Sequence, residues 1–251
     1  MNDISSTNPL FGGKLYGRPL GWNPEDWTDS DDRVRGGRSQ SHLRIERDHA
    51  IFDGHLDINT LGGAGFASQR TTGDDRHWDL TQYAGIELVF DSSGTDEKTY
   101  TFILKDELLP PNPENGREQS TVSWEFDFSK KDAHACHDVP RFHHISITWD
   151  VFKATYRGKP KADAKPLAKH DVKRMSIMMR SFFGTQKGEF SLALITIRGI
   201  LPQPSPDTTR LSSTLDGDDD HSICKFDKPT QRGEQQSKQS IWSRFFCWTQ
   251  L

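Results

Sequence analysis

Residues Ser30–Arg70, SDDRVRGGRSQSHLRIERDHAIFDGHLDINTLGGAGFASQR, place charged, glycine-rich segments between stretches that alternate like β-strands. Residues 31–39 hold too many glycines and charges for the interior of a helix. Paired glycines allow a positive φ or a close approach of another backbone. We therefore predict a tight loop there, with Gly36 or Gly37 in one of these two roles.

Period-two alternation predicts strands on the C-terminal side of this loop. Gln40 to Glu46 alternates polar and apolar residues, and Ala50 to Ile58 repeats the pattern. We interpret Asp53-Gly54 as a turn signal inside the second segment. Extended structure is expected to resume from Phe66 to Thr72. Further strands are predicted near residues 85–91, 99–106, 121–128, 145–151, 172–183 and 190–200.

Many short strands with turn signals between them, and no strong amphipathic helix, indicate an all-β sandwich or jelly roll. The two tryptophans before the loop, Trp22 and Trp27, are expected to pack in its core or at its edge. The alternation also predicts a set of largely buried strand residues: Val122, Trp124, Phe126, Ile145, Ile147, Ile177, Leu192 and Leu194.

Length and charge favour one domain with tails. The chain has 251 residues and a net charge of −4, so it has no global field to attract nucleic acid or acidic lipid. Strand-like segments run without a break from about residue 40 to 200, which fits a single domain over residues 22–200. No apolar run approaches the length of a membrane span.

Both ends of the chain differ from this domain. We expect residues 1–21 to be a flexible lead, and residues 201–251 to be a disordered polar tail. The tail holds a short acidic run, Asp216–Asp220, which we interpret as solvated. Its last segment, Ile241–Leu251, carries four aromatic residues, which we expect to be buried against another surface: a membrane interface, a partner groove or the sandwich itself. Peripheral membrane contact through this segment is therefore one expectation.

Motifs for catalysis and cofactor binding are missing from the sequence. Leu61–Gly65 lacks the G-x-G-x-x-G spacing and is followed by a strand rather than a helix, so it does not fit a dinucleotide loop. The chain has no P-loop, no G-x-S-x-G and no H-E-x-x-H. One segment offers soft metal ligands but only one cysteine, and we interpret it as a polar loop. Its candidate ligands are His134, Cys136, His137, His143 and His144. We expect no catalytic residue, no metal and no cofactor.

Arginines at strand ends and in glycine-rich turns are the stronger candidates for a binding surface. With nearby aromatic and small residues they would recognise carboxylates, sugar hydroxyls or a partner chain. The alternative is that they pair with Asp31, Asp32 and Asp106 as internal struts, and both interpretations stay open. The candidate partner- or ligand-binding residues are Arg35, Gly36, Gly37, Arg38, Ser39, Arg70, Trp124, Tyr156, Arg157 and Arg180.

Six segments in order resemble the CIA30 domain, that of the complex I intermediate-associated protein of about 30 kDa. They read DRVRGGRSQS, LGGAGFASQR, YTFILKDE, STVSWEFDF, FKATYRGK and RSFFGTQKGEFSL, and the resemblance covers roughly Trp22 to Gly199. It implies a galactose-binding-like jelly roll. It also implies a non-enzymatic assembly factor or chaperone-like protein for mitochondrial respiratory complex I (NADH:ubiquinone oxidoreductase), with complex I subunits or assembly intermediates as partners.

Two alternatives accompany this resemblance. A jelly roll of this class could instead bind a carbohydrate or another small ligand outside complex I assembly; an exposed aromatic platform would favour this, whereas an arginine-rich patch would favour protein recognition. The resemblance implies a mitochondrial location. Residues 1–21, however, combine acidic, proline and glycine residues that fit a presequence poorly, so a cytoplasmic location is the alternative.

Overall fold

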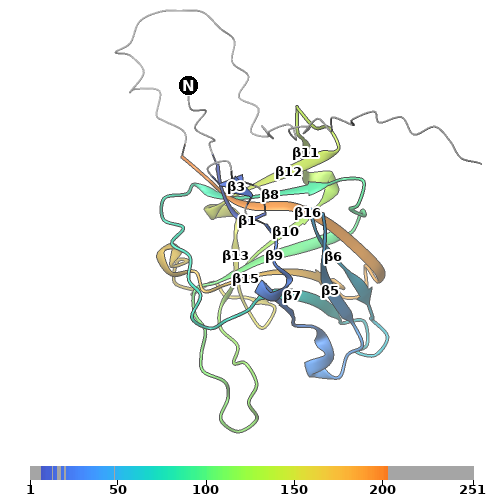
Figure 1. The fold of residues 1–251 in the computed structure, drawn as a ribbon. Helices are drawn as coiled ribbons and strands as arrows, with labels where there is room; N and C mark the ends of the chain where they lie inside the picture. The colour runs from blue at the N-terminus through green and yellow to red at the C-terminus, as the bar shows by residue number, and fades with distance from the viewer. Residues whose placement is uncertain (1–6, 13, 16–17, 20, 48, 203–251) are drawn as a thin grey trace, which may run out of the picture.

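The computed structural model describes residues 7–202, apart from 13, 16–17, 20 and 48. This part of the chain is all-β, and its helical content is confined to short 3₁₀ turns. Two seven-stranded antiparallel sheets pack as the layers of a jelly-roll sandwich, as the sequence predicts (Figure 1). The small hairpin of β2 (Lys14–Leu15) and β3 (Arg18–Pro19) forms a separate pair.

The first sheet has the strand order β11-β12-β8-β16-β6-β5, with β1 paired to β16 outside this path. Every registered strand pair in this sheet is antiparallel. Some of the paired strands, such as β8 and β16, are distant in sequence. Its strands are β1 (Thr7–Gly12), β5 (Gln40–Glu46), β6 (His49–Leu56), β8 (Gly85–Asp91), β11 (His134–Ala135), β12 (Phe142–Thr148) and β16 (Gly188–Ile200).

The second sheet has the order β14-β13-β10-β9-β15-β7-β4. Its strands are β4 (Trp27–Asp29), β7 (Phe66–Thr71), β9 (Thr99–Lys105), β10 (Ser123–Ser129), β13 (Lys153–Tyr156), β14 (Lys159–Pro160) and β15 (Arg174–Arg180). The 3₁₀ turns are η1 (Pro24–Asp26), η2 (Asp32–Arg35), η3 (Lys130–Asp132), η4 (Trp149–Val151) and η5 (Lys169–Asp171).

Alternation along the strands separates a core face from an outer face in the second sheet. On β9, Tyr100, Phe102 and Leu104 are fully buried in the core between the sheets. The intervening Ile103 and Lys105 therefore lie on the outer face. The register of β9 with β15 places Lys105 beside Arg174, so both cations share this outer face.

The burial predicted from the sequence holds for most strands and is only partial on one. Ile145, Ile147, Ile177, Leu192 and Leu194 are buried. Val122, Trp124 and Phe126 are half-buried instead, although the two aromatic rings still pack against the core. Next to β10 on this side lies only the short strand β13, which pairs with residues 123–125, so β10 lies near the edge of the sheet.

One turn was placed wrongly by sequence reasoning. Asp53-Gly54 lies inside β6, and the chain reverses after Glu46, where Arg47 has a φ of 57°. A Cβ atom at residue 54 would lie 2.0 Å from the carbonyl oxygen of Gln40. Gly54 is therefore required by the close approach of the neighbouring strand β5 and does not mark a turn.

The N-terminal segment is not simply the flexible lead that the sequence suggested. Thr7–Gly12 forms β1 along β16, and Phe11 is buried against the two tryptophans that follow it. The Phe11 ring centroid lies 5.8 Å from that of Trp22 and 5.1 Å from that of Trp27. Trp22 also donates from Nε1 to the carbonyl oxygen of Ile195, at 2.9 Å. Both tryptophans thus pack in the core, as predicted.

The predicted polar tail lies outside the described residues from 203 onwards, and so do its acidic run and its aromatic end. In the described part of the chain, no helix has the length and apolar character needed to cross a membrane.

Phe11 tests whether β1 belongs to the domain. Phe11→Ala is expected to lower the free energy of unfolding by about 3 kcal/mol, because it leaves a cavity among packed aromatic rings. Leu109→Ala, at an exposed loop residue, serves as the matched control and should change it by less than about 0.5 kcal/mol. Urea unfolding measures both. Equal, small effects would mean that residues 7–12 do not pack on the domain.

Candidate functional site

Asp31 is a buried carboxylate that joins the two sheets. It accepts hydrogen bonds from the backbone N–H of Ser41 on β5, at 3.1 Å, and from that of Ser68 on β7, at 2.9 Å. The Ser41 hydroxyl donates to it as well, at 2.6 Å. Burial raises the pKa of Asp31, whereas these hydrogen bonds from Ser41 and Ser68 lower it.

Asp32 repeats this arrangement one residue later. It accepts from the backbone N–H of Ser39 at 3.0 Å, from the Ser39 hydroxyl at 2.7 Å and from the backbone N–H of Phe66 at 3.1 Å. We call the two residues together the aspartate clasp. It connects the loop before β5, in the first sheet, to the start of β7 in the second sheet. Ser39, a predicted site residue, is therefore a buried part of the clasp.

Only one of the two predicted roles is present: Gly36 has a positive φ, whereas Gly37 meets the side chain of Asp32 and not another backbone. Gly36 closes η2 with a φ of 82°, in the left-handed region. Gly37 lies against the clasp, where a Cβ atom would come within 2.2 Å of Oδ1 of Asp32. The loop conformation and the buried carboxylate thus require glycine for different reasons.

Three sequence motifs meet at this end of the sandwich. The guanidinium of Arg35 lies 5.2 Å from the centroid of the Phe66 ring. The backbone N–H of Ser181 donates to the carbonyl oxygen of Gly65 at 2.9 Å, which ties the β15–β16 loop to the segment before β7. We call residues 32–39, 62–66 and 181–184 the motif rim, since each range carries one of the glycine-rich motifs.

The motif rim presents two apolar side chains to solvent. Val34 is 63% exposed and Phe183 is 96% exposed. Phe182 and Phe183 have φ values of 44° and 59°, a left-handed conformation that bulky residues rarely adopt. Backbone strain of this kind is maintained by surrounding structure and is common where proteins bind ligands or partners.

Of the arginines on the strands of the second sheet, Arg180 lies beside the motif rim and Arg70 lies apart from it. Arg180 bonds Glu125 at 2.7 Å and also pairs with Asp127, and its guanidinium lies over the ring of Phe182. It therefore adjoins the motif rim. Arg70 lies four residues beyond Phe66 on the same face of β7, about 13 Å further along the strand. It belongs to a different cluster.

The other candidate residues are scattered. Arg38 lies near Asp57 and helps to lower the pKa of that carboxyl, after the hydrogen bonds from Thr60. Arg157 donates to the hydroxyl of Ser120 at 3.3 Å and covers the Tyr156 ring. Trp124 packs against the core side of the second sheet. Arg33 also pairs with the buried Asp31, at 3.4 Å, although the Arg33 side chain is half-exposed and so is not an internal strut.

The outer face of the second sheet carries a cluster that sequence reasoning missed. We call Arg70, Lys105 and Arg174 the cation cluster. All three pair with Glu118, on the loop between β9 and β10: Arg174 Nη1 at 2.8 Å, Arg70 Nη2 at 3.5 Å and Lys105 Nζ at 3.6 Å. Arg174 Nη2 also pairs with Asp74 at 2.8 Å. The strand register brings these residues together, and no local motif signals it.

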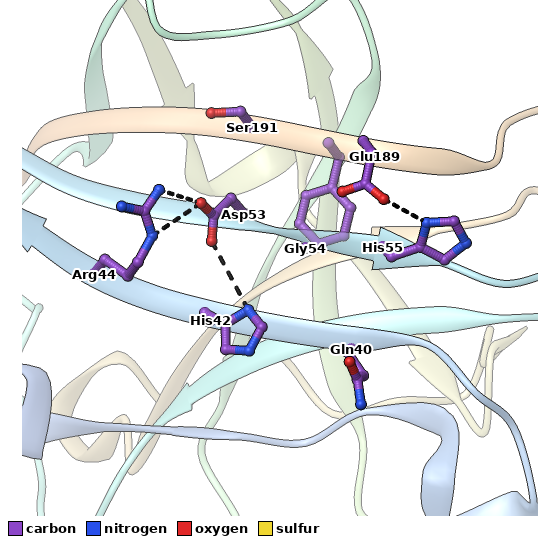
Figure 2. Close-up of a pocket in the computed structure, with 9 residues that line it drawn as sticks. Gln40, His42, Arg44, Asp53, Gly54, His55, Glu189 and Ser191 are labelled. Carbon is purple, nitrogen blue, oxygen red and sulfur yellow. Dashed lines mark hydrogen bonds and ion pairs between the residues drawn. The ribbon is translucent and has the colours of Figure 1, made fainter.

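A shallow polar hollow lies on the outer face of the first sheet, over β5, β6 and β16 (Figure 2). Arg44 Nε donates to Asp53 at 3.0 Å, with His42 4.0 Å from the same carboxylate. His55 lies 2.7 Å from Glu189. The close-up shows these side chains pointing toward one another across the strands. The charges are thus paired within the hollow, and the described residues hold no group of three or more ligands placed for a metal.

Comparison with known proteins assigns the family. The sequence profile of the family described as Complex I intermediate-associated protein 30 (CIA30) matches residues 21–194. Uncharacterized protein C9E9.15 of Schizosaccharomyces pombe is 43% identical over 208 residues, which cover 79% of this chain and 88% of that protein.

Solved structures with a similar arrangement are distant in sequence. The family 11 carbohydrate-binding module of the cellulase Lic26A-Cel5E of Clostridium thermocellum is 11% identical, covering 78% of this chain and 95% of that one, with a TM-score of 0.47. The same family's module in complex with a β-1,3-1,4-mixed-linked tetrasaccharide is 12% identical, covering 70% and 88%, with a TM-score of 0.45.

The two glycines of the loop should differ in their sensitivity to a methyl group. Gly37→Ala is expected to lower the free energy of unfolding by about 2–3 kcal/mol, because the methyl group meets the buried Asp32 carboxylate. Gly36→Ala should cost about 1 kcal/mol, since only the left-handed conformation opposes it. Thermal and urea unfolding measure both variants. The reverse order of the two effects would contradict the described packing of the clasp.

Proposed function

The chain belongs to the Complex I intermediate-associated protein 30 (CIA30) family, and from this we propose that it is a non-enzymatic binding protein in the assembly of mitochondrial respiratory complex I. In this role it holds a complex I subunit or assembly intermediate and works in mitochondria. It needs no cofactor, because its contribution is recognition of a protein surface.

The observation that carries the proposal is the motif rim. Three family-like motifs, the last of which lies more than a hundred residues after the other two, are connected there by the aspartate clasp and by the Ser181–Gly65 hydrogen bond. The loops support an almost fully exposed Phe183 on a strained backbone, beside the exposed Val34. Exposed apolar side chains bordered by arginines are typical of the central contacts in protein interfaces.

The outer face of the second sheet favours protein recognition over sugar binding. Sugar-binding surfaces need exposed aromatic platforms, and at the outward positions of β7, β9, β10 and β15 the single aromatic residue is Phe66. Its ring is covered by Arg35. The other outward positions carry charged, hydroxyl or aliphatic side chains, which suit contacts with a polypeptide.

The experiment that tests this function is complementation. Cells that lack the protein should accumulate complex I assembly intermediates on native gels, and the wild-type chain should restore the mature complex. Phe183→Ala should restore less than about a fifth as much, because an interface anchor is lost, while its melting temperature stays unchanged. Val151→Ala, which truncates an exposed apolar residue elsewhere, should restore it fully.

Normal complex I in cells without the protein would contradict the proposed assembly role. Full restoration by Phe183→Ala would mean that the motif rim is not the contact surface used in this assembly role.

A further inference from the structure

The cation cluster has more positive charge than its surroundings balance. Three cations face two carboxylates, and one of these, Asp74, has a side chain that is 82% exposed and therefore screened by solvent. The Arg174 side chain is only 2% exposed. Burial lowers the pKa of Lys105, and burial together with the nearby Arg174 lowers the pKa of Arg70. Buried cations that are not fully paired are costly to the fold.

Donor groups in the cluster also lack partners at hydrogen-bond distance. The contacts of Lys105 and Arg70 with Glu118, at 3.6 and 3.5 Å, are longer than direct hydrogen bonds. Arg174 Nε is buried and has no hydrogen-bond partner among the described residues. Glu118 therefore satisfies one nitrogen of Arg174 closely and leaves the partly exposed donors of Lys105 and Arg70 without a close acceptor.

Glu118 reaches the sheet from outside. It lies on the loop of residues 106–122, which connects β9 to β10 and projects at the bottom of Figure 1. Three prolines in this loop, Pro110, Pro111 and Pro113, keep it out of the strand ladder. A carboxylate on a loop thus meets cations on a sheet face, as an acidic side chain of a separate peptide would.

We propose that the cation cluster is a binding site for clustered carboxylates, the ligand being an acidic peptide segment, and that Glu118 occupies one carboxylate position of this site. The forked guanidinium group of Arg70, which is partly exposed, matches the two oxygens of a carboxylate, and Lys105 adds a compact charge. The binding of a second carboxylate offsets the excess positive charge and supplies acceptors for the donors that Glu118 does not reach.

Two sources can supply this ligand chemistry. One is an acidic segment of another protein, which would give the proposed binding protein a second contact besides the motif rim. The other is the acidic run Asp216–Asp220 of the same chain. β16 ends at Ile200, whose carbonyl oxygen accepts from the backbone N–H of Ala84. Fourteen residues connect Pro202 to Asp216, and an extended chain of this length spans up to about 46 Å.

Binding of a fluorescent hexaglutamate peptide to the full-length protein, followed by anisotropy, tests the site. Hexaglutamine is the matched probe and should not bind. Lys105→Gln and Arg70→Gln should each weaken hexaglutamate binding about tenfold, whereas Lys153→Gln, at an exposed lysine of β13, should change it less than twofold. Binding should weaken as salt is raised from about 50 to 300 mM.

Glu118→Gln should change the affinity for hexaglutamate in the direction opposite to Lys105→Gln and Arg70→Gln. Removing the charge of the resident carboxylate should tighten hexaglutamate binding about fivefold, because the peptide then competes with a neutral side chain. Circular dichroism and melting temperature check that each variant is folded. The proposal is overturned if the wild-type protein does not bind hexaglutamate, if Lys105→Gln and Lys153→Gln act alike, or if Glu118→Gln weakens binding as Lys105→Gln does.

A variant with asparagine in place of Asp216, Asp218, Asp219 and Asp220 distinguishes the two sources. Tighter peptide binding in this variant identifies the chain's own acidic run as a competitor, and unchanged binding identifies acids of another chain as the ligand. The inference deepens the proposed function by naming a partner chemistry. Peptide binding can fail while complementation through Phe183 succeeds, and the converse also holds, so the two failures are distinguishable.

Discussion

The aspartate clasp is the interaction on which the rest of this end of the sandwich depends. Asp31 and Asp32 together accept backbone hydrogen bonds from the loop before β5, from β5 and from β7, so two adjacent carboxylates connect the two sheets. A carboxylate that loses several such donors while it remains buried becomes strongly destabilising. The clasp therefore fixes the position of the segment before β7, and through it the position of the β15–β16 loop.

The proposed function depends on the side chains that the motif rim exposes. The three loops of the motif rim are held together by one hydrogen bond from a backbone N–H to the buried Asp32 carboxylate and by one between backbone atoms. This rigidity lets Phe183 remain exposed in a left-handed conformation. A backbone that is already fixed loses little conformational entropy when a partner covers its exposed side chain, which favours recognition.

Much of the fold could be predicted from the sequence, because alternating strands reveal themselves locally. The limits of β5 and β8 match the alternation, and the positive φ of Gly36 follows from the paired glycines, whereas the contact of Gly37 with the Asp32 side chain does not. Gly54 was misplaced because Asp-Gly favours turns in isolation, whereas the close approach of Gln40 requires glycine inside a strand. β1 was missed because Pro9 and Gly12 interrupt the alternation that would mark a strand.

The site was less accessible to sequence reasoning, for a physical reason. Lys105 and Arg174 are adjacent only because β9 and β15 pair across nearly seventy residues, and Glu118 joins them from a proline-rich loop. No short sequence motif predicts that these three residues lie close together. The glycine-rich motifs were found because turns leave local signals, but their convergence through Gly65 and Ser181 depends on the tertiary structure.

The central claim is that the motif rim is the surface that recognises a complex I partner. A photo-reactive benzoylphenylalanine at position 183 tests it most directly, with the same group at position 151 as the control. After illumination of intact mitochondria, the account predicts a crosslink to a complex I subunit or assembly intermediate from position 183 and none from position 151. Equal crosslinking from the two positions, or crosslinks from position 183 that contain no complex I protein, would contradict it.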